Sequence, residues 1–165
     1  MDVSPVTAWG EFFVATAGAA AALAGLVFVA LSINLVRIIE TPGVSGRAAE
    51  TIILLAGSLA GSLAALVPHA SSAQLAGLLF VVTLPTWLVP VGIQLKTLRA
   101  QAYQNSRLAI LRAGLHQLAS LPGVLSGVAL LGLLPGGIEW FALGAVMSML
   151  AAMVNAWVLL VEIVR

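Results

Sequence analysis

The sequence predicts an all-α integral membrane bundle of five transmembrane helices, with the whole chain, residues 1–165, in one domain. Hydrophobic residues make up 61% of the chain and charged residues only 8%, whereas a soluble domain carries about 25% charged residues. A helix crosses the roughly 30 Å hydrocarbon core with about 20 mostly apolar residues. Four stretches without Lys, Arg, Asp or Glu are long enough: residues 12–36, 51–95, 113–138 and 140–161.

The first predicted span covers residues 12–36. Between Ala15 and Gly25 nearly every side chain is small. Such a helix offers lipid little bulky apolar surface, and small residues let neighbouring backbones approach. We therefore expect this span to lie centrally in the bundle.

The second uncharged stretch is long enough for two spans. Near its middle Pro68 and Ser71-Ser72 provide a helix-ending proline and small turn residues. The sequence thus predicts a helical hairpin with spans at residues 51–67 and 74–95. The last two spans are predicted at residues 113–134 and 138–161.

The charges predict the orientation, because cationic residues are retained on the cytoplasmic side during membrane insertion. With five spans, all seven cationic residues fall on one side, which gives an outer N-terminus and an inner C-terminus. Aromatic residues suit the headgroup level, and Trp9, Phe12, Phe13, Trp140 and Phe141 are expected at the outer boundary. The cationic residues are Arg37, Arg47, Lys96, Arg99, Arg107, Arg112 and Arg165.

Small residues predict where helices pack. They recur four residues apart on two spans, which permits close helix contact and serine hydrogen bonds to a neighbour. Two interpretations are open: packing inside one subunit, or contact between subunits. The residues concerned are Gly57, Gly61, Ser58, Ser62, Gly123 and Gly127.

Two prolines interrupt the predicted span 74–95. Pro85 and Pro90 remove backbone donors, and Thr83 and Thr86 lie beside them. A carbonyl freed at membrane depth needs a hydroxyl, water or an ion. This segment is either a broken-helix binding site or a kink satisfied by threonine hydroxyls.

Polar side chains from all five spans gather toward the predicted cytoplasmic side. They could line a cytoplasm-facing polar cavity leading to the two prolines, or they could bond to headgroups and loops as residues near helix ends do. Each charged residue is expected at a span boundary. The candidates are Asn34, Glu50, Gln94, His116 and Asn155, with Arg112.

No catalytic, cofactor or metal site is predicted. The chain has no cysteine, and its two histidines, His69 and His116, fall on opposite predicted faces, so a bis-histidine haem and a structural zinc site are not expected. Phosphate-binding, dinucleotide-binding and hydrolase motifs are absent from the sequence. We therefore expect no enzymatic activity, no cofactor and no nucleic-acid partner.

The stretch from Trp9 to Leu35, with Phe12-Phe13, the Ala/Gly run and Ser32-Ile33-Asn34-Leu35, resembles the first helix of small multipass bacterial membrane proteins. That resemblance implies a bacterial inner membrane, with the lipid bilayer as partner, and gives no functional residue. Two functions stay open. One is a homo-oligomeric channel or facilitator; the other is an accessory or scaffold subunit of a larger membrane complex.

Overall fold

The structure, a computed structural model, describes residues 9–41, 43–68, 71–99 and 106–164, without the side chains of 106–109 and 159–164. The described residues form six helices and no strand, and five of the helices are long and apolar enough to cross a membrane. The predicted all-α class with five such helices is confirmed. The helices are α1 (Gly10–Ile33), α2 (Leu35–Glu40), α3 (Val44–Leu66), α4 (Ser72–Arg99), α5 (Ser106–Leu130) and α6 (Glu139–Val164).

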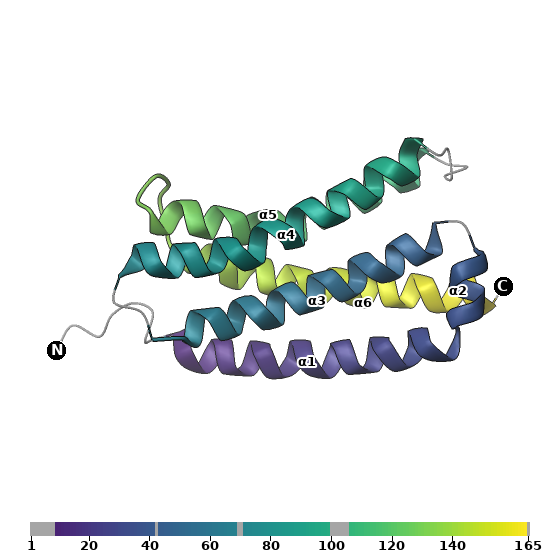
Figure 1. Ribbon diagram of the computed structural model, residues 1–165, viewed down its shortest axis with the longest axis horizontal. Coiled ribbons are helices and arrows are strands. Elements are labelled where there is room, and N and C mark those ends of the chain that lie inside the picture. The colour runs from purple at the N-terminus through teal and green to yellow at the C-terminus, as the bar shows by residue number, and fades with distance from the viewer. Residues whose placement is uncertain (1–8, 42, 69–70, 100–105, 165) are drawn as a thin grey trace.

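The five long helices lie side by side, and the short α2 crosses one end of the bundle (Figure 1). Helix α3 packs against α1, α4 and α6, while α5 packs against α4 and α6. Helix α1 packs mainly on α3. The centre of the bundle is therefore α3.

The expected central position of the first span is wrong. Helix α1 lies at the edge of the bundle and buries only five of its residues. These are Phe13, Thr16, Ala17, Ala20 and Val27. Its small residues lie on both the buried and the exposed sides of the helix, so they do not direct α1 into the centre of the bundle. On α3 the glycines and serines of residues 57–62 share one side, and that side is buried.

Several helix boundaries at the predicted inner side differ from the sequence prediction. Helix α4 continues to Arg99 instead of ending at residue 95, and α5 begins at Ser106 instead of residue 113, which places Arg112 inside the helix. Helix α3 begins at Val44 rather than at residue 51, which places Glu50 inside the helix and not at its boundary. Helix α1 ends at Ile33, before residue 36. At that end the Asn34 side chain donates from Nδ2 to Ala30 O at 3.0 Å and so replaces a continuing backbone bond.

At the other side the structure confirms the helical hairpin and shortens the fourth span. Helix α3 ends at Leu66, α4 begins at Ser72, and the backbone N–H of Gln74 donates to Ser71 Oγ at 3.3 Å. Helix α5 ends at Leu130 instead of residue 134. The turn after it uses Gly132 and Gly136 at φ values of 77° and 97°, a region that disfavours residues with a Cβ.

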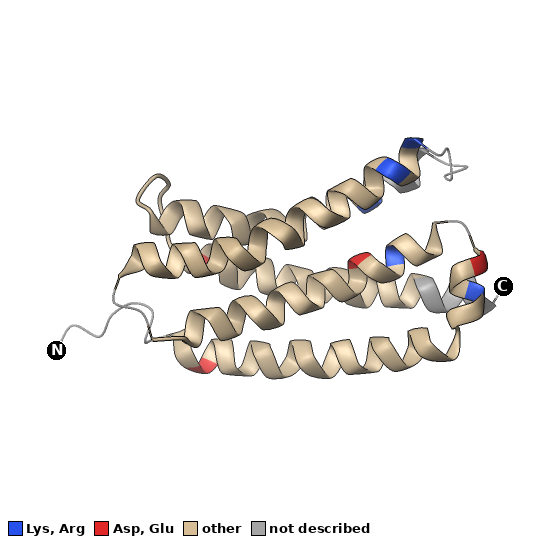
Figure 2. Cartoon of the chain, viewed as in Figure 1, with Lys and Arg blue, Asp and Glu red and all other residues tan. Residues whose placement is uncertain are grey.

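The charges mark the two ends of the bundle (Figure 2). The described cationic side chains lie toward the end where α4 finishes and α5 starts, which we call the basic end. Glu11 and Glu139 lie at the opposite end, at the starts of α1 and α6. The side chain of Arg107, and Arg165 as a whole, lie outside the described residues.

An apolar plug closes the opposite end. It consists of side chains from α1, α4, α6 and the turn before α6, and the rings of Phe13 and Phe141 lie 5.8 Å apart between centroids. Phe13 and Phe141 lie in the first turns of α1 and α6, at the predicted outer boundary, but their rings do not face outward, since they are 0% and 3% exposed. Each ring points inward and packs on the other instead. The plug residues are Phe13, Leu75, Leu79, Ile138 and Phe141.

Glycines on α3 and α5 allow the inner helices to touch. A Cβ built on Gly57 would lie 2.5 Å from Thr86 Cγ2, and one on Gly61 would overlap the Phe141 ring. On α5, a Cβ on Gly123 would lie 3.1 Å from Thr83 Cγ2, and one on Gly127 would lie 2.7 Å from the Phe80 ring. Ser58 and Ser62 are buried beside them. All six predicted packing residues thus lie between helices of one chain.

Replacing Gly61 by alanine should destabilise the bundle. The added methyl group has to displace the buried Phe141 ring, and such overpacking costs about 1–3 kcal/mol. Unfolding of the purified protein in detergent or bicelles measures the loss. Gly77→Ala is the matched control, because a Cβ on Gly77 meets nothing within 4 Å. Equal stability of the two variants would contradict this packing.

Candidate functional site

A buried ion pair joins α3 to α5 near the basic end. Arg112 Nε–H donates to Glu50 Oε2 at 2.8 Å, and Arg112 Nη2 lies 2.8 Å from Glu50 Oε1. The contact from Nε to Oε2 has the geometry of a hydrogen bond, while the contact between Nη2 and Oε1 is an ion pair without that geometry. The Glu50 side chain is 1% exposed and the Arg112 side chain 5%. Their burial inside membrane-spanning helices makes them a candidate functional group.

His116 continues the polar groups one turn further along α5. Its Nε2 lies 3.3 Å from Trp87 O on α4 and 3.2 Å from Ser120 Oγ on its own helix. If Nε2 carries the proton it donates to Trp87 O; in the other tautomer it can accept from the Ser120 hydroxyl only if that hydroxyl gives up its bond to His116 O, at 2.7 Å. The imidazole therefore connects the backbone of α4 to Ser120.

A second contact fixes α4 and α5 at this level. Trp87 Nε1–H donates to Gln117 Oε1 at 2.7 Å. Helix α4 runs unbroken from Ser72 to Arg99 but bends near its middle, where Pro85 and Pro90 lie (Figure 1). Pro90 is buried and Pro85 exposed. The two contacts of Trp87 with α5, to Gln117 and to His116, therefore lie between the two prolines at the bend.

The centre of the bundle holds a small cavity of about 20 Å³, which we call the central chamber. Helices α3, α4, α5 and α6 all contribute to it. Its lining includes five hydroxyl side chains, and Thr83 and Thr86 of the predicted broken-helix site are among them. The hydroxyls belong to Ser58, Thr83, Thr86, Ser120 and Ser148.

The ion pair, His116 and the central chamber form one polar column. Arg112, His116 and Ser120 occur at intervals of four residues on one face of α5, a distance of about 12 Å along the helix. Arg112 holds Glu50, and Ser120 reaches the chamber. We use the name polar column for these groups together.

The other residues of the predicted polar cavity lie in different places. Gln94 and Asn155 are buried on α4 and α6. Gln94 Nε2 has no hydrogen-bond partner among the described residues. Asn34 is half-buried at the junction of α1 and α2, where it bonds to its own helix. Glu50 thus belongs to the column through its ion pair with Arg112, and His116 belongs to it through its contact with Ser120. Asn34 lies outside the column.

Sequence reasoning missed Ser120 and Gln117, and it did not predict the contacts that Trp87 and Ser148 make to α5. Ser148 Oγ–H donates across to Ala119 O at 3.0 Å and so joins α6 to α5. Single serines in apolar helices carry little signal, because each can bond the carbonyl four residues earlier wherever it lies. The interval of four residues from Arg112 through His116 to Ser120 was the one available signal.

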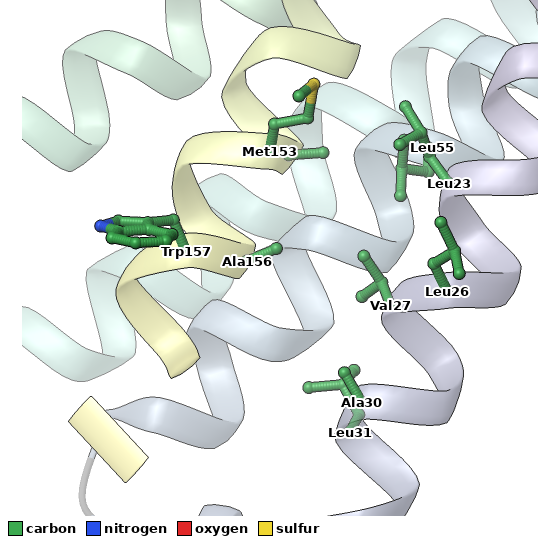
Figure 3. Close-up of a pocket in the computed structure, with 10 residues that line it drawn as sticks. Leu23, Leu26, Val27, Ala30, Leu31, Leu55, Met153, Ala156 and Trp157 are labelled. Carbon is green, nitrogen blue, oxygen red and sulfur yellow. The ribbon is translucent and has the colours of Figure 1, made fainter. Parts of the chain in front are cut away.

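An apolar groove of about 280 Å³ lies between α1 and α6, with Leu55 of α3 as its floor. Figure 3 shows Val27 of α1 and Ala156 of α6 on its two sides. Its lining is almost wholly aliphatic, apart from the ring of Trp157. The groove is separate from the polar column, and no acidic, basic or hydroxyl side chain lines it.

Among the described residues, no three His, Asp or Glu side chains gather as a metal site would require. His69 lies outside the described residues. Comparison of the chain with protein-family models, curated proteins and solved structures found no match. The fold itself defines the class: an all-α bundle whose five apolar helices are compatible with a polytopic membrane protein in contact with lipid. The particular function has to be argued from the polar column.

Removing one partner of the ion pair should strongly destabilise the bundle. An uncompensated buried charge costs about 3–5 kcal/mol, and Glu50→Leu or Arg112→Met alone leaves one behind. Glu50→Leu combined with Arg112→Met should recover much of the loss. Unfolding free energies in bicelles form a double-mutant cycle, with the exposed Lys96→Met as control. Additive losses would show that the two groups do not interact.

Proposed function

We propose that this protein is a homo-oligomeric facilitator of the cell's inner (cytoplasmic) membrane, with a narrow gated path for a small polar solute inside each subunit. The observation that carries the proposal is the polar column. Buried polar groups are costly in membrane helices and mark routes for ions and solutes. Here they run from the basic end to the central chamber, with contributions from four helices.

The apolar plug is the gate in this proposal. The column ends below Phe13 and Phe141, whose rings pack against Leu75 and Leu79. A constriction of apolar side chains blocks conduction by excluding water. The path is therefore closed in this structure, and movement of α1 or α6 is what opens it, because these helices carry the two rings.

The charge distribution supports an orientation with the basic end in the cytoplasm. Helix α1 then starts on the outer side and α6 ends on the inner side. In this orientation the polar column faces the cytoplasm and the plug lies on the outer side.

The outer surface of α1 supports self-association. Ala15, Gly18, Ala22, Gly25 and Val29 are all exposed and follow one another at intervals of three and four residues. A Cβ on Gly18 or Gly25 meets nothing within 4 Å. Small residues at such spacing let two membrane helices pack closely. We call these five residues the α1 small-residue face and assign a second copy of the chain to it.

The same observation favours the second candidate function, an accessory subunit of a larger membrane complex. The α1 small-residue face adjoins the apolar groove, because Leu26 lies one turn beyond Ala22 and lines the groove. A helix of another membrane protein could occupy this surface. In that case the polar column is a structural element and carries no solute.

Flux measurements on proteoliposomes test the facilitator. Phe13→Ala removes one ring of the plug, and we expect osmotic water flow or proton flux to rise by about tenfold as the apolar constriction hydrates. Phe28→Ala, on the same helix but 66% exposed, is the matched control. Phe13→Leu serves if the alanine variant does not fold. Flux equal to that of empty vesicles for the wild type and the Phe13 variants would rule out the facilitator.

Native mass spectrometry tests the interface. We expect a homo-oligomer that becomes monomeric when Gly18 and Gly25 are both replaced by leucine, because the bulky side chains separate the helices. Gly77→Leu on α4 also enters open space and should leave the oligomer intact. A monomeric wild type would contradict self-association, and an oligomer that survives both substitutions would contradict this interface.

A further inference from the structure

The central chamber has the size of a site for a single small molecule. Its volume is about 20 Å³, and a cavity of at least roughly 10–15 Å³ can hold a water molecule if polar partners surround it. Ser58, Thr83, Ser120 and Ser148 are each at most 5% exposed, while Thr86 is half-buried.

Four of the five lining hydroxyls have already donated their protons, and that of Ser120 goes to His116 O at 2.7 Å. Ser58 Oγ–H donates to Leu54 O at 3.1 Å, with a longer contact of 3.5 Å to Ala145 O. Thr86 Oγ1–H donates to Val82 O at 2.8 Å, and Ser148 donates to Ala119 O. A hydroxyl oxygen keeps acceptor lone pairs after donating its proton. The chamber therefore presents several acceptors.

Thr83 supplies the missing donor. Its side chain lines the chamber and is 5% exposed, and its Oγ1 has no hydrogen-bond partner among the residues that the structure describes. Leaving such a buried hydroxyl unsatisfied costs about 1–3 kcal/mol. A ligand that accepts one hydrogen bond from Thr83 and donates to the other hydroxyls would complete the set.

We propose that the central chamber binds one ordered water molecule. Water accepts from Thr83 and donates to two of the oxygens of Ser58, Thr86 and Ser148. A cation accepts no hydrogen bond, and the lining residues carry no carboxylate to balance its charge. Because Ser120 lines the chamber and contacts His116 Nε2, the water extends a chain of polar contacts from His116 to Thr83. This site does not depend on the proposed transport function.

Thr83→Val gives a test with opposite signs for a hydrated and a dry chamber. Valine keeps the shape of threonine but removes the hydroxyl. If water is bound, the variant loses a donor to it, and the melting temperature should fall by about 3 °C. If the chamber is dry, the variant removes an unsatisfied buried hydroxyl, and the melting temperature should rise. A rise would overturn the proposal.

Ser62→Ala is the matched control. Ser62 Oγ is likewise buried and without a partner in the described part of the chain, but Ser62 lines none of the described cavities. Its removal should leave the melting temperature unchanged or raise it. A fall as large as that of Thr83→Val would mean that the loss is general to buried hydroxyls, and this too would overturn the proposal.

Solid-state NMR of the wild-type protein in bilayers detects the water without any substitution. Magnetisation from water should reach the Thr83 methyl group several times faster than the Leu79 methyl groups, which lie one turn away and are 0% exposed. Equal transfer would overturn the water site. The two proposals can fail separately. If the water is detected but the proteoliposomes show no flux, the water site stands and the transport function is rejected.

Discussion

A side chain larger than hydrogen at Gly57 or Gly61 would have to displace Thr86 of α4 or Phe141 of α6, which occupy that space. Helices α4 and α6 therefore approach α3 until backbone and side chains touch. The hydrophobic effect does not hold helices together inside lipid, so this contact area and the hydrogen bonds across it stabilise the bundle. Close approach also shrinks the space between the helices to a cavity of about 20 Å³ and excludes lipid from the polar column.

Several hydroxyls in the interior are satisfied by their own helices. Thr51, Ser58, Thr86 and Ser120 each donate to the carbonyl four residues earlier. Such bonds need no partner helix, and this lowers the cost of placing a polar residue at membrane depth. The Glu50–Arg112 pair is different, because each charge depends on a residue from another helix. The fold around it has to be correct before either charge can be buried.

The sequence predicted the number and order of the long helices, because the uncharged stretches reflect the thickness of a bilayer. It did not predict where Glu50 would lie. A rule that ends each span at a charge treats Glu50 as a boundary, and its partner Arg112 is 62 residues away. Phe13 was placed at the headgroups because an aromatic residue near a span end suits that position equally well. Only the packing of α1 against the other helices distinguishes an inward-facing ring from one in the headgroups.

The pairing of Glu50 with Arg112 also determines how the bundle responds to a membrane voltage. Moving one elementary charge through 100 mV involves about 2.3 kcal/mol of electrical work. Two opposite charges held at 2.8 Å carry no net charge when they move together. A rearrangement of α3 and α5 that keeps this pair intact thus does almost no work against the field. Voltage can act on these two residues only if the pair separates along the membrane normal.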